Sequence, residues 1–499
     1  MMTAETAYTA HILFLLLQLQ LLWGYAGCSS EAGAVGDGGH FDTENQTDSS
    51  SGKNGTNDSS DDTGGNSNAD SDTLSGQDSV TDGSVSDTGS DVSAIDTSSV
   101  LELSSDTGTS VEADTSPSLD TESETNDSYG RDSETGMEPS DDSDTEKTTD
   151  TDNMPIEAVE GEWTWIDFPD SRCRDGSSTG IGVNLSALSP NVFIFLDEGG
   201  ACFESMTCAL NDAQFGESDF NGPTDGIFDR TRAENPVADW SFVLIPYCTG
   251  DVHTGNNPSG IAPRVSEEQQ YVGYDNLNLF LDRLVPTFSN ADHVLFAGAS
   301  AGGFGALMNA ETAVERFSPI PVTIVSDSAP PMSSNEVPSC LQSHWRTLWG
   351  LDNSVLGVCG EDCPDPDDYM IDLALLMHVR YPGVNVGLIS STEDYVIRQF
   401  FSTGADDCAI LDPSLGLAAL AVLVNNSLNV MTGEMFSSGL YSFRQTVLSE
   451  DAAFGTFFIE STEHIWSMSD AFFSADVNGV TPAGWLSDLL SGTVTHVGP

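Results

Sequence analysis

Basic residues are scarce in this 499-residue chain, in which 14 Lys and Arg stand against 79 Asp and Glu, for a net charge of −65 at pH 7. A surface of this sign repels phosphate backbones and anionic membranes, which argues against a nucleic-acid partner. The nine cysteines include no Cys-x-x-Cys pair, the spacing typical of structural zinc sites. We therefore expect no metal and no cofactor.

Residues 29–160 contain no cysteine and very few aromatic residues. The same stretch holds 34 Asp and Glu against 3 Lys and Arg. Such a segment cannot bury enough apolar surface to offset the entropy lost on ordering it. Fragments such as SDTGS recur without a fixed period, and no EF-hand spacing occurs. We expect a disordered, solvated linker at 29–160, followed by one folded domain at 161–499.

The first 28 residues contain the apolar run ILFLLLQLQLLWGYAGC. Two glutamines interrupt the run, and it is rather short for a membrane span, so it is typical of an export signal. Its ending, from Tyr25 to Cys28, resembles a bacterial lipoprotein box, in which the cysteine carries the lipid. The sequence thus predicts an exported protein, either a bacterial cell-surface lipoprotein attached to the membrane through Cys28 or a secreted protein.

Eight cysteines follow Cys28, all within the predicted folded domain. An even number in an exported domain indicates up to four disulfides. The sequence does not fix their connectivity, although Cys202–Cys208 and Cys359–Cys363 are close enough along the chain to be local pairs.

Short apolar runs alternate with longer segments of helical periodicity after residue 160. The runs are continuously apolar, as expected for parallel strands that are covered on both faces. The pattern predicts an α/β-hydrolase-like fold, a mostly parallel sheet with helices on both faces, whose ligands bind at the carboxyl ends of the strands. The predicted strands are 191–197, 241–247, 293–299, 321–327, 384–390 and 455–461, and the helices include 274–288 and 302–317.

The segment Gly298-Ala-Ser-Ala-Gly302 fits G-x-S-x-G and lies between a predicted strand and a predicted helix. In that context Ser300 would sit on a sharp turn, its hydroxyl projecting at the top of the sheet. The N–H of Ala301, at a helix N-terminus, could then hold a developing oxyanion. An ordinary glycine turn that packs a helix on a strand is the alternative.

A serine nucleophile in this fold is followed by an acid and then a histidine. Asp394, beside Glu393, follows the predicted strand 384–390, and His464 follows the last predicted strand. Asp327, after the strand 321–327, is a rival acid. We favour Asp394 because it lies one strand later, with His464 as the base that takes the proton of Ser300 and Asp394 as the group that orients the ring. A surface histidine is the alternative reading of His464.

The first predicted strand ends in FLDEGGACF, where Gly199 and its neighbours leave backbone N–H groups unshielded. An early glycine-rich loop supplies further oxyanion donors in this fold. We assign Gly200 and Ala201 to the oxyanion hole together with Ala301. A glycine turn without a catalytic role is the alternative.

These features together resemble the pectin acetylesterase family, to which Notum-like carboxylesterases belong. The resemblance rests on LDEGGACF…C at 196–208, PYCTGDVHTG at 246–255, GASAGGFGA at 298–306, Asp394 and His464. It implies an α/β-hydrolase fold, metal-free ester hydrolysis through Ser300, and disulfides Cys202–Cys208 and Cys173–Cys248. One departure is Ala201, where Notum has tryptophan.

The leading hypothesis is an exported serine carboxylesterase that removes acetyl or another acyl group from a carbohydrate or glycoconjugate. A lipid-ester or polyester hydrolase on the same residues is the rival enzyme, and it would need an apolar mouth. A surface lipoprotein that presents a binding domain is the non-enzymatic alternative. Residues 336–381 and 413–450 are predicted to form the lid and pocket walls. Asp251 and His253 either line the pocket or are structural.

Overall fold

The computed structural model describes residues 154–363 and 368–499. The predicted signal segment with Cys28, and the linker up to residue 153, lie outside these residues and stay predictions. In the part of the chain that is described, no single helix is both long and apolar enough to cross a membrane, and one bent helix pair, Tyr395–Leu411 with Pro413–Leu428, meets the criterion by length and composition alone.

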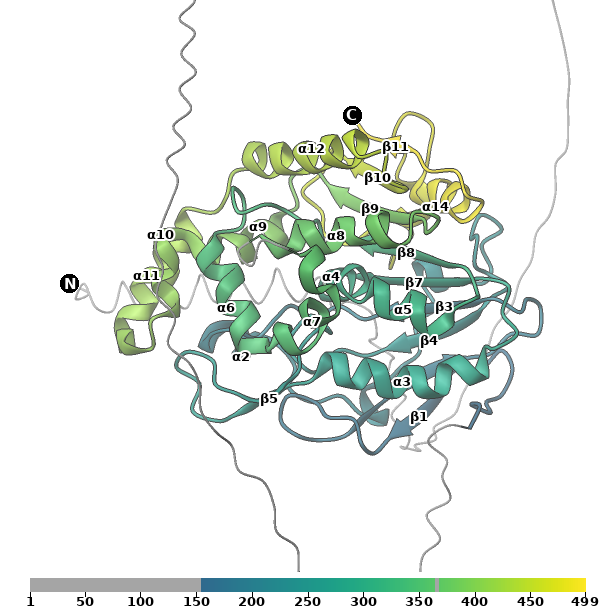
Figure 1. Ribbon diagram of the computed structural model, residues 1–499, viewed down its shortest axis with the longest axis horizontal. Helices are drawn as coiled ribbons and strands as arrows, with labels where there is room; N and C mark the ends of the chain where they lie inside the picture. The colour runs from purple at the N-terminus through teal and green to yellow at the C-terminus, as the bar shows by residue number, and fades with distance from the viewer. Residues whose placement is uncertain (1–153, 364–367) are drawn as a thin grey trace, which may run out of the picture. The chain divides into compact units, whose positions relative to one another are not determined.

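A nine-stranded sheet forms the centre of the described residues (Figure 1). Its strands from β4 to β11 in spatial order run parallel, and β1 and β2 add an antiparallel edge. The predicted α/β-hydrolase-like fold is therefore confirmed. In spatial order the strands are β1 (Thr164–Phe168), β2 (Thr179–Asn184), β4 (Ser241–Ile245), β3 (Val192–Leu196), β7 (Val294–Ala299), β8 (Val322–Asp327), β9 (Val386–Ser391), β10 (Phe454–Ile459) and β11 (His496–Val497).

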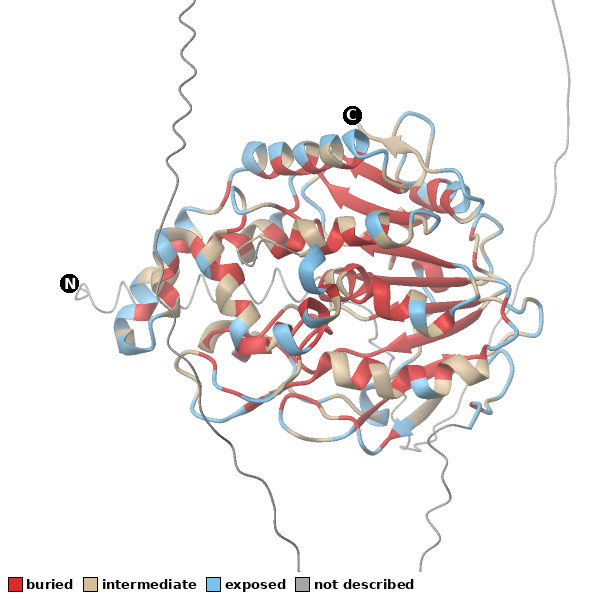
Figure 2. Cartoon of the chain, in the orientation of Figure 1, coloured by how far each residue is buried: buried red, intermediate tan, exposed pale blue. Residues whose placement is uncertain are grey.

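Both faces of the sheet are covered, which explains why its strands are continuously apolar. All five residues of β3 are buried. Because successive side chains of a strand point to opposite faces, Ile194 and Leu196 join one apolar cluster, whereas Phe193 and Phe195 join a second cluster on the other face. Figure 2 shows the strands as a buried layer between helices whose outer faces are exposed.

The helices divide between the two faces. Residues of α3, α4, α5, α6, α8 and α12 pack in the larger cluster with Ile194, and residues of α13 and α14 pack in the cluster with Phe193. The helices are α2 (Ser205–Leu210), α3 (Gly273–Thr287), α4 (Ala301–Met308), α5 (Ala310–Phe317), α6 (Ser339–Trp349), α7 (Val355–Cys359), α8 (Tyr369–Arg380), α9 (Tyr395–Phe401), α10 (Ala405–Cys408), α11 (Ala419–Leu428), α12 (Gly433–Ser449), α13 (Ala471–Ser474) and α14 (Pro482–Leu490).

The predicted helix 302–317 is two helices, α4 and α5, that meet at Asn309. The Asn309 side chain donates to the carbonyl oxygens of Gly305 and of His253, so it ties the junction to a distant loop. The sequence did not predict β1, β2 and β11 at the sheet edges or the small hairpin of β5 (Asn257–Gly260) and β6 (Gln269–Tyr271). β1, β5 and β6 are partly exposed and β11 has two residues, whereas β2 is fully buried but reads TGIGVN, so none of them shows the apolar run of a central strand.

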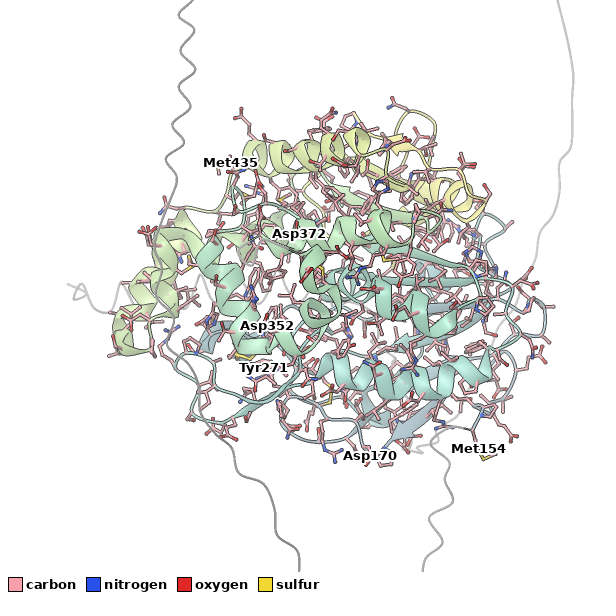
Figure 3. All side chains as sticks on the ribbon, in the orientation of Figure 1. Met154, Asp170, Tyr271, Asp352, Asp372 and Met435 are labelled. Atoms are coloured by element: carbon pink, nitrogen blue, oxygen red, sulfur yellow. A yellow bond between two sulfur atoms is a disulfide. The ribbon has the colours of Figure 1, made fainter. Side chains whose placement is uncertain are left out.

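All eight cysteines of the folded domain are paired. The two disulfides implied by the family resemblance, Cys173–Cys248 and Cys202–Cys208, are present, as is the local pair Cys359–Cys363. The fourth, Cys340–Cys408, joins α6 to α10. Cys202 also lies 3.1 Å from the hydroxyl of Tyr271, a buried residue labelled in Figure 3.

Candidate active site

Ser300 occupies a strained turn between β7 and α4. Its backbone has φ 51° and ψ −117°, a region that residues other than glycine seldom adopt and that is found at functional sites. Close packing explains the neighbouring glycine, because a Cβ on Gly302 would lie 1.9 Å from the carbonyl oxygen of Leu196. The local geometry is that of a nucleophile elbow.

Asp394 and His464 come together from the ends of two adjacent strands, β9 and β10. Asp394 Oδ2 lies 2.7 Å from His464 Nδ1, and the aspartate is fully buried. Its other oxygen, Oδ1, accepts hydrogen bonds from the N–H groups of Val396 and Ile397 and so caps α9. The carboxylate is thus held at both oxygens, in the position that fixes the ring of a catalytic histidine.

The carboxylate of Asp394 raises the pKa of His464. Burial disfavours the imidazolium, but Asp394, with smaller contributions from Glu198 and Asp327, outweighs it and raises the pKa of His464 above its ordinary value. The described contacts include no hydrogen bond from Ser300 Oγ to the ring. The serine–histidine step therefore stays a prediction.

The glycine-rich loop after β3 meets the elbow. Gly200, Ala201, Ser300 and Ala301 all line one cavity. Gly200 has φ 76°, which suits glycine and turns the chain at this point. The backbone N–H groups of Gly200, Ala201 and Ala301 donate to no acceptor within residues 154–363 and 368–499. They remain available to a substrate oxygen, as the predicted oxyanion hole requires.

The loop from Thr249 to Gly255 is hydrogen-bonded to the residues on either side of the glycine-rich loop. The carbonyl oxygen of Asp197 lies 3.0 Å from His253 Nε2, and the Cys202 N–H donates to the Gly250 carbonyl. Burial lowers the pKa of His253 to about 4, so the ring is neutral at pH 7. Asn211, which the sequence did not single out, donates to the Gly199 carbonyl from the end of α2.

Asp251 and His253 do not line the cavity, whereas Val252 between them does. The Asp251 carboxylate is buried and accepts hydrogen bonds from Thr249, His253 and Gly255 within its own loop and from the N–H of Gly273 at the start of α3. Of the two readings that the sequence left open, the structure supports the structural one.

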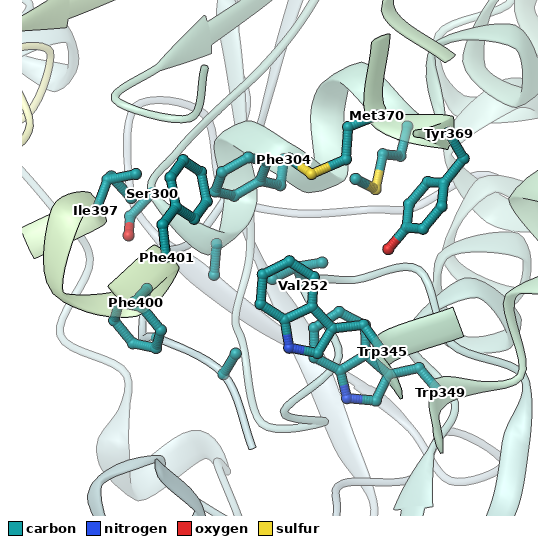
Figure 4. A pocket seen from close by; sticks show the side chains of 14 residues that line it. Val252, Ser300, Phe304, Trp345, Trp349, Tyr369, Met370, Ile397, Phe400 and Phe401 are labelled. Carbon is teal, nitrogen blue, oxygen red and sulfur yellow. The ribbon is translucent and has the colours of Figure 1, made fainter. Parts of the chain in front are cut away.

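The cavity beside Ser300 encloses about 490 Å³ of empty space, part of it open to solvent, and is lined almost wholly by apolar side chains. In Figure 4, Ser300 lies at one end of these side chains, with Tyr369 and Trp349 at the other. The helices contribute Phe304 and Met308 from α4, Trp345 and Trp349 from α6, Tyr369 and Met370 from α8, and Ile397, Phe400 and Phe401 from α9.

The pocket walls differ in part from the prediction. The segment 336–381 does supply walls, through α6 and α8, but none of the lining residues comes from 413–450, because α9 takes that place. The indoles of Trp345 and Trp349 stack with ring centroids 5.7 Å apart, and Trp349 Nε1 donates to the Cys202 carbonyl. The wall and the glycine-rich loop are thereby joined.

The rival acid, Asp327, contacts the loop that follows His464 and not the ring of His464 itself. Its carboxylate accepts hydrogen bonds from Ser328 and from the backbone of Trp466 and Ser467, and no hydrogen bond joins it to the ring of His464. Asp394 is thus the better placed of the two. Within the described residues no group of three or more His, Cys, Asp or Glu side chains is arranged to hold a metal ion.

The sheet topology defines an α/β-hydrolase-like protein, in which Ser300, Asp394 and His464 follow strand ends. Residues 156–362 match the family model described as Pectinacetylesterase, so the family indicated by the sequence resemblance is confirmed for this part of the chain. The match includes Ser300 and the glycine-rich loop and ends before Asp394 and His464.

Curated relatives include palmitoleoyl-protein carboxylesterase notum2 of Xenopus laevis, 30% identical over 28% of this chain and 29% of that protein. The human palmitoleoyl-protein carboxylesterase NOTUM is 31% identical over 29% of this chain and 30% of that protein. The chain thus spans less than a third of the length of these relatives. A solved structure of the Wnt deacylase Notum from Drosophila matches with a TM-score of 0.48 at 17% identity, covering 67% of this chain and 95% of that one.

Proposed function

We propose that this protein is an exported serine carboxylesterase that cleaves esters of acyl chains longer than acetyl. The observation that carries the proposal is the apolar cavity that opens beside Ser300. An acetyl group on Ser300 would cover only part of this apolar lining, which extends to Trp349 and Tyr369 at the far end in Figure 4. Burial of each further methylene of a longer chain is favourable by about 0.8 kcal/mol. The names of the curated relatives, palmitoleoyl-protein carboxylesterases, support the same substrate class.

The proposed reaction has two halves. His464 accepts the proton of Ser300 while the oxygen attacks the ester carbon, and the N–H groups of Gly200, Ala201 and Ala301 stabilise the tetrahedral oxyanion. Protonated His464 then gives its proton to the leaving alcohol, and the acyl group stays on Ser300. Water, deprotonated by the same ring, releases the fatty acid.

Export is supported by the four disulfides of the described residues, since such bonds persist in oxidising compartments. The leaving alcohol could belong to a protein, a carbohydrate or a lipid. A lipid-ester hydrolase is the second candidate, because the apolar lining suits a lipid acyl chain whatever alcohol carries it.

Hydrolysis of p-nitrophenyl esters from two to sixteen carbons by the purified chain tests the proposal. We expect kcat/KM to rise with chain length beyond acetate, and Ser300→Ala to lose the activity. Ser449→Ala, at an exposed site at the end of α12, serves as the matched serine control. A preference for acetate would refute the longer-acyl proposal, and equal rates for Ser300→Ala and wild type would refute the serine mechanism.

A further inference from the structure

The Asp327 carboxylate is buried at the end of β8, and one of its oxygens holds the loop that follows His464. Oδ2 accepts hydrogen bonds from the Trp466 N–H at 2.8 Å, from the Ser467 N–H at 2.7 Å and from the Ser467 hydroxyl at 2.6 Å. A buried carboxylate is costly unless hydrogen bonds satisfy it. Three donors on one oxygen therefore fix this loop tightly to the strand end.

The other oxygen acts through Ser328. Asp327 Oδ1 accepts from the Ser328 hydroxyl, whose oxygen in turn accepts from the Ile465 N–H at 3.0 Å. Ile465 directly follows His464 and has φ 66°, a strained value for a β-branched residue. Strain of this kind persists only where the surroundings enforce it. The hydrogen bond from the Ile465 N–H to Ser328, which Asp327 holds in place, is therefore a contact that can enforce this conformation.

The main chain of Asp327 contacts the nucleophile. Its carbonyl oxygen accepts a hydrogen bond from the Ser300 N–H at 2.9 Å, because β7 and β8 pair in parallel up to this point. A single residue is therefore bonded both to the backbone of the elbow and to the backbone beside His464.

We propose that Asp327 is a positioning residue for the proposed esterase reaction, one that sets His464 relative to Ser300 and adds negative charge near the ring. The proposal rests on the proposed function, and it assigns Asp327 a role different from that of Asp394, which contacts His464 directly. A carboxylate with a merely structural role would stabilise the fold without affecting the ring.

The charge component follows from the groups around His464. Burial lowers its pKa, and the carboxylates of Asp394, Glu198 and Asp327 raise it. In Asp327→Asn the amide oxygen can still accept the loop N–H groups, but the charge is gone. The pKa of His464 should therefore fall, and the acid limb of kcat/KM should move to lower pH, because the ring must be neutral to accept the proton of Ser300.

The strain component predicts a rescue. Asp327→Ala removes every side-chain bond to the loop, and we expect kcat to fall by about 100-fold, the cost typical of a small misplacement of a catalytic group. Glycine adopts positive φ without strain, so Ile465→Gly added to Asp327→Ala should let the backbone beside His464 return to its native conformation. We expect this to restore kcat by roughly 10-fold, the size of the strain energy of one such residue.

The test is an NMR titration of ¹³C-labelled histidines in the full chain, with kinetics on p-nitrophenyl octanoate. Glu311→Gln is the control, since Glu311 on α5 is also a buried carboxylate but pairs with Arg380 on α8. We expect the pKa of His464 to fall in Asp327→Asn and to stay unchanged in Glu311→Gln.

An unchanged pKa of His464 in Asp327→Asn overturns the proposal, and so does a double variant no faster than Asp327→Ala. The titration requires no turnover. A chain without esterase activity would therefore refute the proposed function, while the titration would still decide the effect of Asp327. Asp327→Asn keeps the proposal testable even where Asp327→Ala fails to fold.

Discussion

Replacement of Asp394 by asparagine separates the two roles of this side chain. In the native protein Oδ2 faces His464 Nδ1, and Oδ1 caps α9. An asparagine can keep the cap through its oxygen, because Asn and Asp are comparable N-cap residues. Its NH₂ group would then face Nδ1 and donate to it, leaving the proton of the ring on Nε2, where it blocks transfer from Ser300.

The magnitudes follow from these contacts. A wrong tautomer of this kind lowers kcat by about 10⁴-fold in serine hydrolases, which corresponds to ~5 kcal/mol in the barrier. Stability should change little, because the cap survives. Asp394→Ala should lose a similar factor in kcat and, in addition, about 1 kcal/mol of folding free energy, since the cap is removed.

Steady-state kinetics on p-nitrophenyl octanoate and urea unfolding of the same samples measure the two effects. Glu393→Gln is the control, because Glu393 precedes Asp394 in the same loop and is exposed. We expect it to keep nearly full activity. A larger loss of kcat in Glu393→Gln or in Asp327→Asn than in Asp394→Asn would show that another carboxylate orients the ring.

Two further predictions concern pH and packing. Activity should fall as the pH drops through the raised pKa of His464, because the protonated ring cannot accept a proton, and the midpoint of kcat/KM should lie above the ordinary pKa of histidine. This acid limb should persist in Asp197→Asn, although burial and then Glu198 raise the pKa of Asp197 to about 7. A limb that vanishes in that variant would assign it to Asp197. Gly302→Ala should lower the free energy of unfolding by ~1–3 kcal/mol or more, because its Cβ would lie 1.9 Å from the Leu196 carbonyl oxygen, whereas a Cβ on Gly383 meets nothing within 4 Å. Equal urea midpoints for Gly302→Ala and Gly383→Ala would refute this reasoning.

The central strands and the elbow could be predicted because their signals are local. The strands are buried on both faces and so are apolar throughout. The residues around Ser300 are small because the backbone of neighbouring segments passes close to that turn. Asp394 and His464 could be predicted because they directly follow such strands. The order of elements was therefore enough to place them at one edge of the sheet.

The role of Asp327 could not be predicted in the same way. Its partners lie 139 and 140 residues away in the sequence, and a carboxylate after a strand has the same local signature whether it contacts a histidine or a loop. The walls of the cavity show the same limit. An apolar helix such as α9 has one pattern whether its face meets a core or a pocket, so only packing reveals that Ile397 and Phe401 line the site.

The separation between the reacting groups and the cavity walls has an evolutionary consequence. Ser300, Asp394 and His464, the proposed reacting groups, lie at strand ends, where a shift of the backbone would disturb the pairing of neighbouring strands. Apart from Phe304 and Met308 of α4, the helical walls of the cavity come from α6, α8 and α9, and α8 and α9 follow the segment that matches the family model. Drift in those helices can alter which acyl group a descendant enzyme accepts while its chemistry is conserved. Proteins that share the turn at Ser300 could therefore differ in substrate specificity while they keep the same mechanism.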